Sequence, residues 1–339
     1  MGSFWGGNLP HRIAVCCTVA MKPVLCGILL AAPLAAQVRI AQHGIEYISV
    51  EIKDKPFTQF FIGPETNKPY LHPLRSASGK IVTRGYPMEE DIPGESRDHP
   101  HHRGLWFSHG DVNGFDFWGN EARGGKFGRI VLAKINSLTD GKDSGAIDAT
   151  FDWRDPAGQV LLSEGRRMTF YGQAKTRTID FDITLTAREK VTFGDTKEGT
   201  FAVRLASALE EPHGGAPAQP ERTGHLVDSQ GGEGEKQVWG KRADWADYYG
   251  VLNGEPLGIA IFDHPSNPRH PTYWHARSYG LFAANIFGVH DFENDKSKNG
   301  SLTLAPGEAL RFRYRVTIHP GDVRSAHIAR LYTDYAGGR

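Results

Sequence analysis

Cysteine is scarce in this sequence and is confined to one end of it. Only three of the 339 residues are cysteine, namely Cys16, Cys17 and Cys26. The last of them lies in an apolar run, residues 24–32, which follows Lys22 and precedes the small residues 33–36. A basic start, a short apolar run and small residues form the pattern of a secretory signal, so we expect cleavage near Ala36.

Export would leave a periplasmic or extracellular chain that has no cysteine. Disulfides, thiol nucleophiles and zinc sites built on cysteine would then all be excluded from the mature protein. We interpret the first 20 residues as a start site assigned too far upstream. The expected organisation is an export signal at residues 1–36, followed by a single domain at 37–339.

The sequence also lacks an excess of either charge and any long apolar run. Its 39 Lys and Arg residues match its 39 Asp and Glu residues. This balance argues against a nucleic-acid partner, which demands a basic surface. No stretch approaches the ~20 consecutive apolar residues of a spanning helix, so we expect a chain that is not embedded in a membrane.

The pattern of β-strands is abundant instead. Apolar and polar residues alternate at 45–52, 178–185 and 310–318, as in strands with one packed and one wet face. A helical pattern occurs at 323–335, and no strand–helix–strand alternation points to a parallel sheet. We therefore predict an all-β fold, one large antiparallel β-sandwich with a short C-terminal helix, in which residues 210–236 form a loop insertion.

Histidines are concentrated in one segment, where four of the chain's 15 lie between residues 99 and 109. Alternate residues of an extended chain share a face, which would place these side chains on one side: His99, His101, Arg103, Leu105, Phe107 and His109. Imidazoles on one strand face can bind one metal ion. The segment therefore predicts a divalent metal site built by His99, His101 and His109, with oxygen from Asp98, Asp111 or Asp116.

Acid–base chemistry is an equally open interpretation of the same histidines. A His beside an Asp is the pairing that orients a general base, which makes His101 and His102 candidate catalytic residues. Arg103 would stabilise the charge of an enolate or carboxylate. A hydrogen-bonded cluster with a purely structural role, bent by Pro100, is the third interpretation.

A Lys–Glu pair precedes the strand predicted at 200–209. Lys197 would supply a cation for developing negative charge, and Glu198 a second proton acceptor or donor. A dipeptide of this kind is also common as a solvated surface pair.

Candidate substrate-binding residues come from two places. The proline-stiffened loop 263–275 carries Arg269, His270, Trp274 and His275, and loops on rigid sheets commonly carry sites. The His-rich segment adds Trp106, Asp116 and Trp118. Tryptophan faces can stack on the C–H face of a sugar, although most tryptophans are simply core, and this loop can equally be a stiff connection.

Together these segments resemble the bacterial family of unknown function DUF6807, formerly labelled "methane oxygenase PmoA". The matching residues are 98–105, 109–114, 116–118, 195–199, 242–245, 247–248 and 269–272, and the resemblance spans about residues 40–335. It implies an exported protein of carbohydrate breakdown, because members are similar to exported proteins encoded near sugar oxidoreductases. The large sandwich of sugar mutarotases is a fold-level analogy.

The function expected from these observations is an exported carbohydrate-active enzyme. It would be a lyase or hydrolase that acts on a glycoside or keto-sugar by His/Glu acid–base chemistry, with a small-molecule or oligosaccharide substrate. A divalent metal ion could take the place of the Arg103 or Lys197 cation. A non-catalytic sugar-binding module is the alternative. An accessory of a methane oxygenase is a third, disfavoured because copper oxygenation of methane would need a membrane-embedded subunit.

The candidate residues predict one shared site. Loops of a sandwich gather at its ends, so the His-rich segment and the loop 263–275 are expected to meet. The test of this prediction is whether His101, His102, Glu198 and either His270 or His275 surround one cavity.

Overall fold

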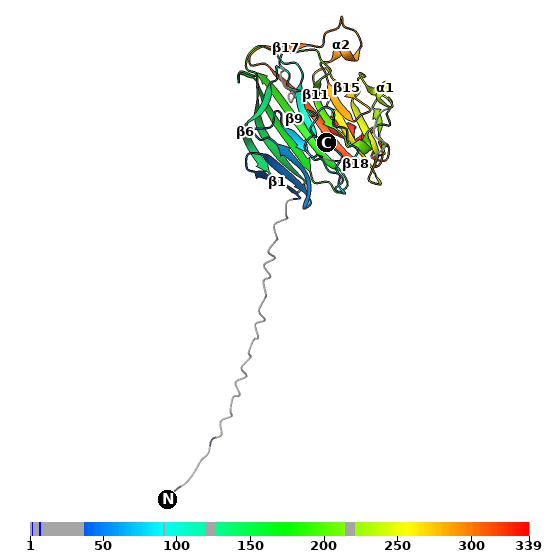
Figure 1. Ribbon diagram of the computed structural model, residues 1–339. Coiled ribbons are helices and arrows are strands. Elements are labelled where there is room, and N and C mark those ends of the chain that lie inside the picture. The colour runs from blue at the N-terminus through cyan, green and yellow to red at the C-terminus, as the bar shows by residue number, and fades with distance from the viewer. Residues whose placement is uncertain are drawn as a thin grey trace. The chain divides into compact units, whose positions relative to one another are not determined.

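The computed structural model describes residues 37–90, 92–119, 126–213 and 221–338, besides the isolated Gly2 and Gly7. Every named element falls in one compact unit, Ala35–Arg339, and a second unit covers Met1–Leu34. The predicted export signal lies outside the described residues. In the main unit the strands form the body and the helices are short and peripheral (Figure 1).

Within the described chain, two antiparallel sheets of eight strands make up the fold. The first, called sheet 1 here, runs in the order β1 (Val38–His43), β2 (Tyr47–Ile52), β3 (Lys55–Phe61), β4 (Tyr70–His72), β5 (Leu105–His109), β11 (Gly199–Arg204), β16 (Leu281–Asn285) and β15 (Tyr273–Ala276). The strands β5 and β11 lie at its centre, although their sequences are about a hundred residues apart.

The second sheet, called sheet 2, runs in the order β12 (His225–Asp228), β13 (Trp245–Leu252), β14 (Glu255–Asp263), β18 (Ala309–Pro320), β9 (Arg177–Ala187), β8 (Val160–Tyr171), β7 (Ser144–Arg154) and β6 (Arg129–Thr139). A separate two-stranded ribbon pairs β10 (Val191–Phe193) with β17 (Leu302–Leu304). The prediction of a mostly β fold built from large antiparallel sheets is confirmed.

Strands β9 and β18 show why the sequence adopts this fold. They are neighbours in sheet 2, and the apolar residues of their alternating pattern are buried: Ile179, Phe181, Ile183, Leu185, Phe312, Tyr314, Val316 and Ile318. On the opposite face Arg315 forms an ion pair with Asp180 (2.6 Å) and Arg311 forms one with Asp182. One face is therefore packed and the other carries complementary charges across the strands.

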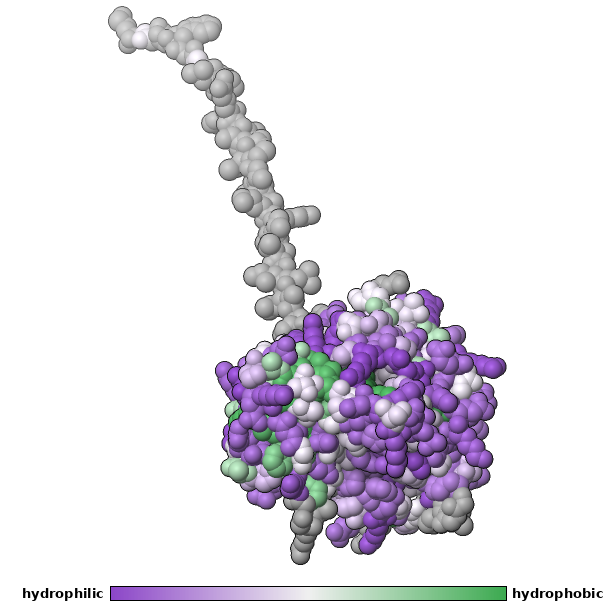
Figure 2. Space-filling model, turned by 90° about the horizontal axis from the view of Figure 1, so that it is seen from above, coloured by the Kyte–Doolittle hydropathy of each residue, from purple (hydrophilic) through white to green (hydrophobic). Residues whose placement is uncertain are grey.

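The core lies between the two sheets. The ring of Phe201 on β11 stacks on Tyr314 of β18, with 4.5 Å between centroids, and Phe107 on β5 contacts Phe312 at 5.5 Å. Such aromatic pairs fix how the inner faces of the sheets interdigitate. Seen from the end at which β17 and α2 lie, the surface is mostly hydrophilic, with apolar residues gathered in limited areas (Figure 2).

The helices are α1 (Glu235–Val238), α2 (Val289–Phe292), α3 (Ile328–Ala336) and the 3-10 turn η1 (Ser207–Leu209). None of the helices in the described ranges is long and apolar enough to cross a membrane. The C-terminal helix predicted at 323–335 begins later than expected, because His327 has a left-handed backbone (φ 54°) that interrupts it. The loop predicted at 210–236 contains the edge strand β12, which pairs with β13, and its last two residues begin α1. The loop prediction is therefore wrong for these six residues.

Candidate active site

The outer face of sheet 1, which points away from the core, is where most of the predicted residues meet. On β5, Leu105 and Phe107 enter the main core, whereas Trp106 belongs to a separate cluster on the outer face. Trp106 lies opposite Ala202 of β11, and Ser108 lies opposite Thr200. Because side chains alternate along a strand, these residues form the floor of the candidate site.

The His-rich segment folds over this floor instead of continuing the strand. His99 and Gly104 both have positive φ values, 43° and 53°, and they break the extended chain on which the alternation of residues 99–109 was predicted. The His102 ring consequently lies 5.3 Å from Trp106 and 5.9 Å from Trp118, and the two tryptophans are 5.0 Å apart. Three aromatic rings are thus in mutual contact on one face.

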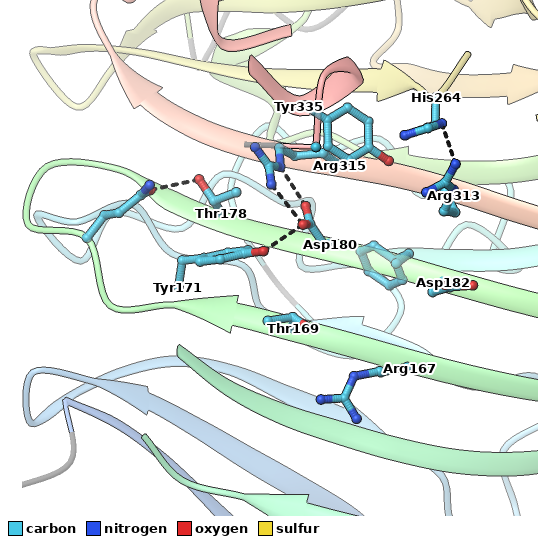
Figure 3. Close-up of a pocket in the computed structure, with 13 residues that line it drawn as sticks. Arg167, Thr169, Tyr171, Thr178, Asp180, Asp182, His264, Arg313, Arg315 and Tyr335 are labelled. Atoms are coloured by element: carbon cyan, nitrogen blue, oxygen red, sulfur yellow. Dashed lines mark hydrogen bonds and ion pairs between the residues drawn. The ribbon is translucent and has the colours of Figure 1, made fainter. Parts of the chain in front are cut away.

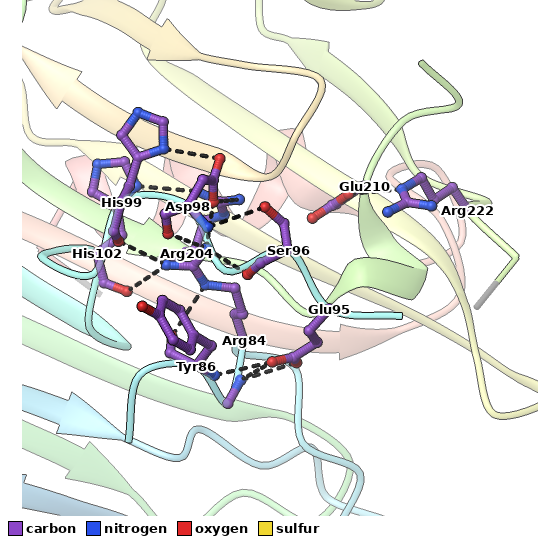
Figure 4. Close-up of polar contacts among 11 residues, drawn as sticks. Arg84, Tyr86, Glu95, Ser96, Asp98, His99, His102, Arg204, Glu210 and Arg222 are labelled. Atoms are coloured by element: carbon purple, nitrogen blue, oxygen red, sulfur yellow. Dashed lines mark hydrogen bonds and ion pairs between the residues drawn. The ribbon is translucent and has the colours of Figure 1, made fainter. Parts of the chain in front are cut away.

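A network of buried charges holds the segment in place (Figure 4). The guanidinium groups of Arg84 and Arg204, both fully buried, donate to Asp98 Oδ1 over 2.7 and 3.0 Å. His99 Nδ1 contacts the other oxygen of Asp98 at 2.9 Å. Burial opposes ionisation of Asp98, but the hydrogen bond from His99 and the charge of Arg204 outweigh it and hold its pKa well below the usual range.

His101 and His102 are held neutral. Burial, followed by the charges of Lys68 and of His99, lowers the pKa of His101 to about 3. Burial also lowers the pKa of His102 well below its usual value, together with the charges of His101 and Arg204. Arg204 Nη1 donates to His102 Nδ1 over 3.1 Å. The prediction that His102 acts as a general base must be corrected, because this nitrogen's lone pair is already engaged.

Glu198 and His275 reach the same face from two other strands. Glu198 immediately precedes β11, and its half-exposed carboxylate lies 3.2 Å from Lys197 Nζ. His275 lies on β15, opposite Ala283 of the neighbouring β16, and its Nδ1 donates to the Lys197 carbonyl over 2.8 Å. Burial lowers the pKa of His275 to about 4, and the negative charge of Glu198 opposes this shift.

Charge interactions connect these groups around the floor. Burial raises the pKa of Asp116, with Lys68 opposing and Glu198 adding to the shift. The positive charge of Lys68 also lowers the pKa of His101, and Lys68 Nζ lies 6.0 Å from the centroid of the Trp106 ring. Burial raises the pKa of Tyr279, and the negative charge of Glu198 adds to this shift. The Tyr279 ring stacks on His99 with 5.6 Å between centroids. The ionisable side chains therefore surround the tryptophan-bearing floor.

Several polar atoms on this face lack a hydrogen-bond partner among the described residues. They are His102 Nε2, Trp106 Nε1, Ser108 Oγ, Trp118 Nε1 and Thr200 Oγ1, all of them buried. A buried polar atom without a partner costs about 1–3 kcal/mol, and a group of them on one face calls for a bound water or ligand. The arrangement can therefore bind a polar molecule and exchange protons with it.

The predicted metal ligands do not come together. His109 lies on the core side of β5, where Nε2 donates to the Gly194 carbonyl over 2.9 Å and the ring packs on Phe287 at 4.5 Å. His99 and His101 belong to the loop over the other face. No cluster of three or more His, Cys, Asp or Glu side chains suited to a metal occurs among the described residues, so the set of His99, His101 and His109 is corrected to two separate environments.

Three of the four residues predicted on the loop 263–275 have structural roles. Trp274 is buried in the core and donates from Nε1 to the Ala243 carbonyl over 3.0 Å. Arg269 donates to the carbonyls of Ile286 and Ser301 over 3.1 and 3.0 Å. His270 is held between carboxylates, 2.7 Å from Asp263 and 3.3 Å from Asp244. The structure thus brings His275, and not His270, to the candidate site.

Sequence reasoning missed the residues that support the site. Arg204 is the charged residue of β11, and a lone charge in a strand of small and apolar residues with one threonine was the available signal. Lys68 donates to the Trp118 carbonyl over 2.7 Å, and nothing in its sequence neighbourhood indicates this contact. Arg103, which was predicted, lies over the Tyr70 ring at 5.8 Å, on the outer face and not on the side of Leu105 and Phe107 with which the alternation grouped it.

A groove of about 450 Å³ lies elsewhere, on the outer face of sheet 2 (Figure 3). Its charges are largely matched within the protein: Asp180 accepts from Arg315 over 2.6 Å and from Tyr171 over 2.7 Å. Among the predicted site residues, none lines this groove. We therefore place the candidate site on sheet 1.

Comparison with solved structures shows similar folds. A galactose mutarotase-like protein from Clostridium acetobutylicum is 10% identical with a TM-score of 0.41, over 84% of this chain and 99% of that chain. A putative aldose 1-epimerase from Klebsiella pneumoniae is 10% identical with a TM-score of 0.44, over 88% and 87%. The GH36 α-galactosidase AgaB from Geobacillus stearothermophilus is 8% identical with a TM-score of 0.42, over 85% of this chain and 42% of its own.

At these identities the likeness concerns the fold alone, and the chain spans less than half the length of the α-galactosidase. A search of curated proteins found no match. The family comparison covers most of the chain, since residues 47–333 match the model of a family of unknown function. The protein therefore belongs to DUF6807, the family that its motifs resemble.

Proposed function

We propose that the protein is an exported carbohydrate-active enzyme whose active site is the outer face of sheet 1. It acts as a lyase or hydrolase on a glycoside or keto-sugar through acid–base chemistry. One observation carries the proposal: a half-exposed carboxylate at Glu198 and neutral histidines at positions 101 and 275 surround a floor that bears Trp106 and Trp118. Aromatic faces and polar rims suit sugars.

The proton acceptors in this proposal are His275 and Glu198. Because His275 Nδ1 donates to a backbone carbonyl, its proton resides there and Nε2 keeps a lone pair. Glu198 is accessible, with 37% of its side chain exposed, and can take or give a proton. Lys197, paired with Glu198, supplies positive charge for an oxyanion that forms during reaction.

The decisive experiment measures turnover of a panel of glycosides and 3-keto-glycosides by the full chain, with and without chelator. We expect Glu198→Gln to lower kcat by at least ~100-fold, the usual contribution of a general acid or base, while sugar binding changes little. Glu308→Gln is the matched control, because the Glu308 carboxylate accepts a bond from the Ala305 amide in the turn before β18 of sheet 2.

The outcomes separate the two functions under consideration. Binding of a sugar without turnover of any member of the panel would establish the sugar-binding module instead of the enzyme. Loss of turnover on chelation would assign the cationic role to a metal ion.

Export forms part of the proposal and has its own test. Edman sequencing of protein recovered from outside the cytoplasm is expected to start at or near Gln37. A start at Met1 or Met21 would contradict it.

A further inference from the structure

The tautomer of His102 follows from its neighbour. A guanidinium can only donate hydrogen bonds, and Arg204 Nη1 lies 3.1 Å from His102 Nδ1. Nδ1 must therefore accept, which leaves the single proton of the neutral ring on Nε2. His102 thus presents an N–H donor to the outer face, where no described residue accepts from it.

Two further donors lie beside it. The indole N–H groups of Trp106 and Trp118 are also buried and have no acceptor among the residues described, and the three rings are within 5.0–5.9 Å of one another. An indole, like this imidazole tautomer, donates from its N–H and offers no lone pair there. The nearby Asp98 is already engaged by Arg84, Arg204 and His99.

This set of donors discriminates between ligand groups. A sugar hydroxyl that accepted these bonds would bring a proton that itself needs an acceptor, whereas a carbonyl or carboxylate oxygen brings lone pairs alone. The two buried guanidinium groups behind His102 also favour partial or full negative charge at this place.

We propose that His102, Trp106 and Trp118 bind the carbonyl or carboxylate oxygen of an oxidised sugar, and that Arg204 is the positioning residue that keeps the His102 donor available. This inference rests on the proposed function and narrows its substrate class to keto-sugars and uronates. The three N–H groups are buried, and the half-buried His101 packs edge-on against His102 at 4.5 Å. In this proposal the ligand therefore reaches them as the His101 side chain turns aside.

The first test is a binding titration by tryptophan fluorescence in the Glu198→Gln background, which prevents turnover. Its three probes are methyl β-glucoside, the 3-keto derivative of that glucoside, and methyl β-glucuronide. At least one oxidised probe is expected to bind at least tenfold more tightly than the glucoside. Tighter binding of the 3-keto probe would identify a carbonyl as the ligand group, and tighter binding of the glucuronide a carboxylate. Adding His102→Leu is expected to reduce this preference below threefold, whereas His225→Leu on the edge strand β12 leaves it unchanged.

The second test reads the tautomer directly by ¹⁵N NMR of labelled histidine in the full chain. The proton is expected on Nε2 of His102 in the wild type and in Arg204→Lys, which keeps a donor. In Arg204→Met it is expected to be distributed between Nδ1 and Nε2, as a mixture of the two neutral tautomers. This measurement on the wild type decides the point even if His102→Leu does not fold.

Three results would overturn the inference: equal binding of all three probes or of none, a preference that survives His102→Leu, or a proton on Nδ1. If neutral glycosides are turned over and oxidised sugars are not bound more tightly, the proposed enzymatic function stands and this inference is wrong. If oxidised sugars are bound more tightly but no sugar is turned over, this inference stands and the proposed enzymatic function is wrong.

Discussion

Glu164 and Arg166 carry opposite charges inside the hydrophobic core. Both side chains are buried on the inner face of β8, 2.5 Å apart. Trp153 donates to the second oxygen of Glu164 over 2.7 Å, and the guanidinium lies over the Phe151 ring at 5.1 Å. Burying a charge is tolerated only when it is paired, so each of the two residues depends on the other.

We predict that Arg166→Met lowers the free energy of unfolding by about 3–5 kcal/mol, because it leaves the carboxylate of Glu164 buried without a cation. The double variant Glu164→Gln/Arg166→Met is expected to recover most of this loss, since Gln still accepts from Trp153. Urea denaturation of the wild type, the single variants Arg166→Met and Glu164→Gln, and the double variant measures these changes. Additive losses in the double variant would contradict the prediction.

At the scale of elements, helix α3 is attached to the outer face of sheet 2 by a small apolar cluster. Ile328 and Tyr335, one at each end of the helix, pack with Trp245 of β13 and with Ala260 and Phe262 of β14. Ile328 is fully buried. The helix has nine residues, too few to be stable alone in water, so its structure depends on this packing.

Ile328→Ala is therefore predicted to destabilise the protein by about 2–5 kcal/mol, the range for truncating a buried aliphatic side chain. Arg330→Ala, on the exposed side of the same helix, is expected to change stability by no more than about 0.5 kcal/mol. Thermal unfolding followed by circular dichroism compares them. Equal, small effects of both would show that α3 contributes little to the fold.

These elements also show what could be predicted from the sequence. The strands around Phe181 and Phe312 were predictable because their burial follows the two-residue period of a strand. The path of residues 98–104 was not, because it leaves the extended conformation at His99 and Gly104 and is held by Arg84 and Arg204, which are distant in sequence. Contacts between residues a hundred positions apart leave no local pattern, which is why Arg204 was missed. The break in the extended chain at His99 and Gly104 separates His109 from His99 and His101, which strict alternation grouped on one face.

At the scale of the whole molecule, buried neutral histidines make stability depend on pH. In the described chain the pKa is lowered at these six: His72, His101, His102, His109, His264 and His275. Burial is the first cause for each. A lowered pKa means that the unfolded chain binds a proton near pH 6.5, whereas the folded chain binds it only at lower pH, near pH 4 for His109. Their stabilisation is thus present above pH ~6.5 and lost as the pH falls towards 4.

We accordingly predict that the free energy of unfolding decreases between pH 6.5 and 4.5, by up to about 1.4 kcal/mol per pH unit for each such histidine. His109 offers the cleanest test, since it lies in the core and outside the candidate site. His109→Gln should reduce the number of protons taken up on unfolding by about one, as obtained from guanidinium denaturation at a series of pH values. An unchanged slope would mean that His109 is protonated in the folded protein.

The central strand β11 has a consequence for how this protein can evolve. Glu198 precedes it, Arg204 ends it, and every residue between them is buried in sheet 1. The two groups are therefore held a fixed distance apart by the same hydrogen bonds that hold the sheet together. The segment that carries His101 lies outside the hydrogen-bond ladder of β11 and is tied to it through Asp98, which accepts from Arg204. Residues 99–103 can thus change in sequence without altering the strand, while β11 keeps Glu198 and Arg204 in register.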